Sequence, residues 1–144
     1  MFNRKQLMNE YLEKFPEIDN KNLTSEKVRN HMSREVVKTF FNTNYKSTSA
    51  RMRYLRATLN FINYIANNTK VKHIDNIKYY HFKEYILYLL KKKKTNGEKL
   101  KENYINTEIN GVLYYFGLMK INNPKLKKGA AYLMQEVKKE NDIQ

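Results

Sequence analysis

Cysteine is absent from this 144-residue sequence, and glycine and proline are rare, with four and two residues. The lack of cysteine excludes a disulfide framework, thiolate metal ligands and a cysteine nucleophile, and it fits a reducing compartment. No apolar run approaches the roughly 20 residues that span a membrane. The N-terminal residues are charged and amphipathic, unlike an apolar signal region. We therefore expect a cytoplasmic protein.

Sequence patterns for catalysis or cofactor binding are also scarce. The glycines stand alone, so a glycine-rich phosphate-binding loop is missing. The spacing of His81 and Glu84 is only a weak metal-ligand pattern, and surface histidines are expected. A tyrosine nucleophile for phosphoryl transfer needs Arg and His clustered around the phosphate, and the chain has only six arginines. We therefore expect no catalytic residue, no metal, no cofactor and no small-molecule substrate.

Positive charge is the most informative property of the chain. Lys and Arg total 28 against 14 Asp and Glu, which gives a formal net charge of +14. Such an excess on a small protein attracts polyanions and favours phosphate contacts. We therefore predict binding to nucleic acid, with duplex DNA as the preferred partner. AT-rich codons, which favour Lys and Asn, are an alternative explanation, and an anionic membrane surface is a weaker alternative partner.

Apolar residues recur with the helical period, and the alternation typical of strands is hard to find. The pattern predicts helices at about 3–15, from Ser25 to a polar break at 42–47, and then at about 47–67, 76–93, 101–120 and 130–140. We expect Asp75 or Asn76 to cap the fourth helix and residues 95–98 to form a turn. The predicted fold class is all-α.

Three basic or polar clusters are the candidate DNA contacts. The first, at the start of the third helix, comprises Lys46, Ser47, Ser49, Arg51, Arg53 and Arg56. Three arginines so close together are unusual in a chain that prefers lysine, and guanidinium groups match phosphates and guanine edges. The alternative is a solvated helix face.

The second cluster surrounds the predicted turn and comprises Lys91, Lys92, Lys93, Lys94, Lys99 and Lys101. Cations at a helix C-terminus are also expected from the helix dipole alone. A smaller patch, formed by Lys125, Lys127 and Lys128, has the character of a flexible basic linker.

The third cluster lies at the start of the helix predicted at 101–120. Its residues are Lys101, Asn103, Tyr104, Asn106, Thr107 and Asn110, and the first five are the candidate contacts. Asn and Thr weaken helices, which indicates that something other than helix propensity selected them at these positions. AT-rich codons are again the alternative explanation. Amides and hydroxyls near a helix N-terminus reach base edges in a major groove while lysines hold phosphates. We predict that this cluster and the arginine cluster form one continuous face.

The stretch from Ser47 to Pro124 resembles the N-terminal core-binding domain of phage-integrase-type tyrosine recombinases. The resemblance rests on Tyr54 and Phe61 in the first helix, the segment from His81 to Leu89, Tyr104-Ile105-Asn106 with the apolar stripe after it, and the closing Asn123-Pro124. Tyr104 departs from the family, which usually has Thr there. The matching part covers a little over half of the chain.

The resemblance implies a four-helix, sterile-alpha-motif-like (SAM-like) core-binding bundle at 46–124, an additional N-terminal helical arm at 1–45, and a basic linker with a short C-terminal helix at 125–144. In the family this domain grips duplex DNA, and the catalytic residues lie in a C-terminal domain that would begin where this chain ends. We expect the DNA-binding half of a recombinase-like protein from a mobile element, either a fragment or a naturally short relative. Its partners would be duplex DNA and a catalytic domain or recombinase protomer.

Two rival functions stay open. One is a stand-alone DNA-binding regulator of a plasmid or phage. The other is a helical protein-interaction module whose basic face docks on an acidic partner.

Overall fold

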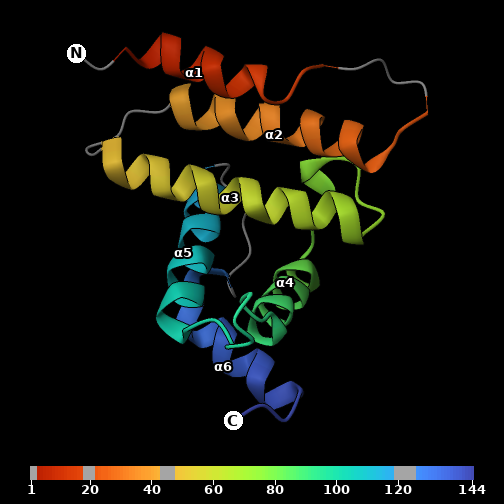
Figure 1. Ribbon diagram of the computed structural model, residues 1–144, viewed down its shortest axis with the longest axis vertical. Coiled ribbons are helices and arrows are strands. Elements are labelled where there is room, and N and C mark those ends of the chain that lie inside the picture. Colours follow the sequence, from red (N-terminus) through yellow and green to blue (C-terminus); the bar gives the residue numbers. More distant parts are fainter. Residues whose placement is uncertain (1–2, 18–21, 43–47, 119–125) are drawn as a thin grey trace. The chain divides into compact units, whose positions relative to one another are not determined.

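A computed structural model describes residues 3–17, 22–42, 48–118 and 126–144 (Figure 1). Those residues form six α-helices, two short 3-10 helices and one isolated antiparallel bridge. The all-α class predicted from the sequence is confirmed. Contacts divide the chain into two compact units, Met1–Ile77 and Lys78–Gln144. None of the helices in the described ranges is long and apolar enough to cross a membrane.

The first unit is a layer of three helices with α2 in the middle. Helix α1 spans Arg4–Glu13, α2 spans Ser25–Asn42 and α3 spans Thr48–Asn68, followed by the 3-10 turn η1 at Ile74–Asn76. Helices α1 and α3 lie on either side of α2 (Figure 1). The buried side chains of α2 and α3 recur at helical spacing and include Met32, Val36, Phe40, Leu55, Ile62 and Ile65.

Arg34 of α2 fastens the end of α1. Its Nη1 donates hydrogen bonds to the carbonyl oxygens of Leu12 and Phe15, at 3.2 and 3.1 Å. Its Nε lies 3.4 Å from Glu17 Oε1. Carbonyl groups at a helix C-terminus lack partners within their own helix. The Arg34 side chain of the neighbouring helix therefore supplies hydrogen-bond donors to two carbonyl groups just before Pro16.

The second unit holds α4 (Tyr79–Lys91), α5 (Glu102–Leu118), the 3-10 turn η2 (Leu126–Lys128) and α6 (Ala130–Glu140). Helix α6 packs on both α4 and α5. Its buried residues are Ala130, Leu133, Met134 and Val137, which share one face of the helix. The unit is therefore a three-helix packing in which α6 covers the other two.

Acidic residues tie α6 to α4 and α5 at the surface. Lys83 Nζ of α4 lies 2.6 Å from Glu140 Oε1 and 3.7 Å from Glu136 Oε1. The Tyr79 hydroxyl donates a 2.7 Å hydrogen bond to Glu136 Oε2. Burial, followed by the hydrogen bond to this carboxylate, raises the pKa of Tyr79. Lys138 of α6 pairs in the same way with Glu102 of α5.

The start of α4 corrects the prediction. Asp75 and Asn76, expected as caps, belong to η1, and α4 begins at Tyr79 with Lys78 as its N-cap residue. His81, expected on the surface, is only 4% exposed, and its Nδ1 accepts a 2.8 Å hydrogen bond from the Lys78 amide. An imidazole at the third helical position thus bonds back to the N-cap amide, as the acidic or amide side chain of a capping box does.

The border between the two units, after Ile77, falls inside the range 46–124 that the sequence assigns to one domain. Helix α3 packs on α2, which the sequence assigns to the arm at 1–45. The domain limits and the four-helix arrangement stay predictions.

Candidate nucleic-acid interface

Residues 91–101, from the last residue of α4 to the residue before α5, form a small hairpin that we call the basic hairpin. Lys93 and Lys99 form its antiparallel bridge. The Lys94 amide donates to the Glu98 carbonyl at 2.7 Å, and the Gly97 amide donates to the Lys94 carbonyl at 2.9 Å. Gly97 has φ of +87°, a left-handed conformation that glycine adopts without strain. Backbone hydrogen bonds therefore hold the turn that the sequence predicts at 95–98.

Six lysines project from the basic hairpin. They are Lys91, Lys92, Lys93, Lys94, Lys99 and Lys101, and all are exposed. Within the described part of the chain, no carboxylate pairs with any of them. Lys92 Nζ lies 5.6 Å from the centre of the Tyr88 ring. Among the described residues nothing neutralises these charges, whereas carboxylates neutralise Lys83 and Lys138, so the hairpin lysines are available to external phosphates.

Helix α5 begins directly after the hairpin and carries the third cluster. Asn103, Tyr104 and Thr107 are exposed, whereas Asn106 is half-buried and its Oδ1 is enclosed without a hydrogen-bond partner among the described residues. Although Tyr104 is exposed, partial desolvation and the nearby Glu108 carboxylate raise its pKa. The structure therefore brings three of these polar candidates to the surface and turns Asn106 partly inward.

The three arginines of the first cluster lie on different sides of α3. Arg53 and Arg56 are exposed, but Arg51 is only 2% exposed, which corrects its assignment as a DNA contact. Residue 51 stands four positions before the fully buried Leu55, so the two share the inward face of the helix. Lys46 and Ser47 lie outside the described residues, as does the side chain of Ser49.

The smaller basic patch lies before α6. Lys127 and Lys128 are exposed residues of η2, and Lys128 Nζ lies 4.6 Å from the centre of the Tyr132 ring. Lys125 lies outside the described residues. The arginines belong to the first unit, whereas the basic hairpin, α5 and η2 belong to the second. A single continuous face therefore stays a prediction.

His31 takes part in two contacts that were not predicted from the sequence. His31 and Glu35 are four residues apart on α2, and Nε2 lies 3.4 Å from Oε1. The rings of His31 and His73 meet edge to face, with centres 5.7 Å apart. Among the residues that the structure describes, no group of three or more His, Cys, Asp or Glu is placed to hold a metal ion.

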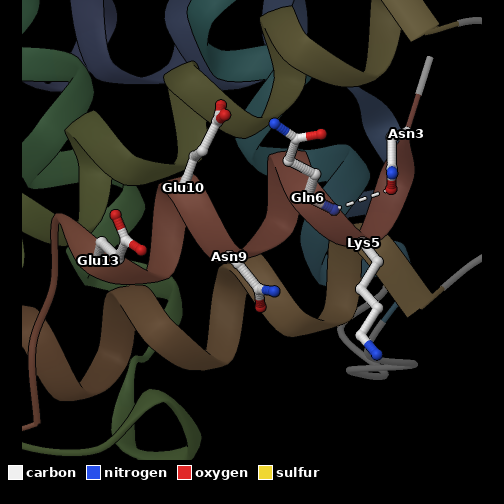
Figure 2. Close-up of a pocket in the computed structure, with 6 residues that line it drawn as sticks. All are labelled: Asn3, Lys5, Gln6, Asn9, Glu10 and Glu13. Carbon is white, nitrogen blue, oxygen red and sulfur yellow. Dashed lines mark hydrogen bonds between the residues drawn. The ribbon is translucent and has the colours of Figure 1, made fainter. Parts of the chain in front are cut away.

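A surface hollow lies on α1, but the polar side chains that line it do not point toward a common centre. Its lining residues are Asn3, Lys5, Gln6, Asn9, Glu10 and Glu13. Figure 2 shows Lys5 and Asn9 on one side of the helix and Gln6 and Glu10 on the other. The backbone N–H of Gln6 donates a 3.0 Å hydrogen bond to Asn3 Oδ1, so the Asn3 side chain caps the helix. The polar groups diverge, whereas a ligand site needs them to converge.

Comparison of the chain with protein-family models, with curated proteins and with solved structures finds no match.

Proposed function

We propose that this chain is a duplex-DNA-binding module of a tyrosine-recombinase-like protein from a mobile element, acting in the cytoplasm. In this proposal residues 46–124 form the SAM-like core-binding bundle, and the chain holds a recombination-type site for a catalytic domain or a recombinase protomer. No residue of the chain takes part in strand cleavage.

One observation carries the proposal, namely the six exposed lysines of the basic hairpin, which no carboxylate of the described residues neutralises. Each lysine that neutralises a phosphate releases counterions, and the affinity then falls with salt at a log–log slope of about −0.9 per contact. Six contacts would give a slope of about −5. Arg53, Arg56, Lys127 and Lys128 are exposed as well and would add to the positive field.

The test is a salt titration of the binding of the full chain to a labelled duplex, followed by fluorescence anisotropy. The variant Lys93→Gln/Lys94→Gln/Lys99→Gln removes three hairpin charges. The control variant Lys5→Gln/Lys38→Gln/Lys139→Gln removes three exposed charges from α1, α2 and α6 and leaves the same net charge. We expect the hairpin variant to flatten the slope by about 3 and the control variant to change it by less than about 1.

No duplex binding by the parent chain at about 50 mM salt would overturn the proposed function. Binding to a polyglutamate chain under the same conditions would then favour a partner that is an acidic protein. Equal flattening by the two variants would overturn the basic hairpin as the phosphate-binding element.

A further inference from the structure

Five exposed positions of α5 share one uncharged face. We call this face the polar stripe, and its residues are Asn103, Thr107, Asn110, Tyr114 and Gly117. Buried Ile105, Ile109, Val112 and Phe116 turn the other way. Helix α5 contains neither Lys nor Arg, although the chain has 28 of them. A helix that starts at a lysine-rich hairpin therefore presents neutral hydrogen-bonding groups to its surroundings.

The stability of α5 does not account for the residues of the polar stripe. Asn, Thr and Gly are poorer helix formers than Ala, Leu or Lys. Asn110 and Gly117 are exposed, and no atom of the described residues lies within 4 Å of a Cβ added to Gly117. Packing among the described residues thus does not require glycine at this position. The missing side chain leaves room for the close approach of a partner.

The acidic residues of α5 are withdrawn from the polar stripe. Glu102 pairs with Lys138 of α6, and Glu108 is half-buried with Oε2 enclosed. Thr107 Oγ1 donates a 2.9 Å hydrogen bond to the carbonyl oxygen of Asn103. The Thr107 methyl group and the lone pairs of its oxygen are what remain for a partner.

These groups match one kind of base pair. In the major groove, an asparagine amide bonds with both N6 and N7 of adenine, and Thr methyl groups and aromatic rings contact the thymine methyl group. Guanine is read by Arg or Lys and cytosine by Asp or Glu, and the polar stripe contains none of these. The chemistry of the stripe therefore favours A·T over G·C.

We propose that the polar stripe reads A·T base pairs in the major groove of duplex DNA while the basic hairpin holds the flanking phosphates. This inference rests on the proposed DNA-binding function. From Asn103 to Asn110 the helix rises roughly 10 Å at 1.5 Å per residue. That is the rise of about three base pairs at 3.4 Å each. The amides thus span a short A·T run.

The experiment measures the binding of the full chain to short labelled duplexes that share their flanks and differ in a central A·T or G·C run. A third duplex carries 7-deazaadenine in the A·T run, which removes N7 from the major groove and leaves the minor groove unchanged. The variant Asn110→Ala is compared with Asn9→Ala, which changes an exposed asparagine in the middle of α1. Circular dichroism checks that both variants keep their helix content.

We expect the parent and Asn9→Ala to prefer the A·T run over both the G·C run and the 7-deazaadenine run. Asn110→Ala should lose roughly tenfold of that preference and keep its affinity for the G·C duplex, because an amide adds discrimination but no charge. Equal parent affinity for the three duplexes, or an unchanged preference in Asn110→Ala, would overturn the inference and leave the proposed function standing. Absence of binding to every duplex at low salt would overturn both.

Discussion

His81 makes the stability of α4 dependent on pH. Its imidazole is buried, and Nδ1 accepts a hydrogen bond from the Lys78 amide. A proton on Nδ1 would remove that acceptor and place a charge in a poorly solvated position. Burial lowers the pKa of His81 below its ordinary 6.5, with Lys78 acting in the same direction and Glu84 opposing it.

The sign of the pH effect follows from this lowered pKa. Because the unfolded chain binds the proton more readily, the free energy of unfolding rises with pH. The contribution of His81 is fully present above about pH 6.5 and is lost as the pH falls through the lower pKa of the folded state. We expect the chain to unfold at a lower urea concentration at about pH 5 than at about pH 7.5.

Two substitutions separate the hydrogen bond from the titration. His81→Leu removes the acceptor, and an amide left without a partner costs about 1–3 kcal/mol of unfolding free energy. His81→Gln keeps an acceptor that does not titrate, so it should weaken the pH dependence. His73→Gln, which changes an exposed imidazole, is the control and should leave that dependence in place. Urea unfolding followed by circular dichroism measures all four chains, and an equal pH dependence in His81→Gln and His73→Gln would refute the reasoning.

Three further predictions concern the stability of α5, the contacts of α6 and the absence of DNA cleavage by the chain alone. Gly117→Ala should raise the free energy of unfolding by up to about 1 kcal/mol, because Ala is the better helix former and no atom of the described residues lies within 4 Å of the added Cβ. A lower melting temperature would contradict this. Glu136→Gln should lower the free energy of unfolding by about 1 kcal/mol, because Tyr79 and Lys83 lose a charged partner, and thermal unfolding that matches the parent would speak against it. The chain alone should neither cleave DNA nor attach to it covalently, and a phosphotyrosyl–DNA species on a denaturing gel would disprove that expectation.

Local features of the structure could be predicted from the sequence because their causes are local. The helix predicted at 130–140 is found at Ala130–Glu140, and those predicted at about 47–67 and from Ser25 begin and end within one or two residues of the prediction. Apolar residues spaced three and four apart define a buried face whatever it packs against. The Thr-Asn-Gly turn likewise needs only a glycine that adopts a positive φ, and Gly97 supplies it.

The candidate site could be predicted only in part, because exposure depends on which side of a helix is covered. Grouping Arg51 with Arg53 and Arg56 treated neighbours in sequence as neighbours in space, yet the helical turn places Arg51 on the buried side. The same periodicity extends the exposed face of α5 beyond Thr107 to Asn110, Tyr114 and Gly117, of which only Asn110 belongs to the cluster predicted from the sequence.

Contacts between distant segments were decided by the tertiary structure alone. Arg34 reaches the end of α1 across more than a dozen residues, and Lys83 meets Glu136 and Glu140 through the packing of α6 on α4. Such pairs carry no local sequence signal, because their partners become neighbours only when the helices pack.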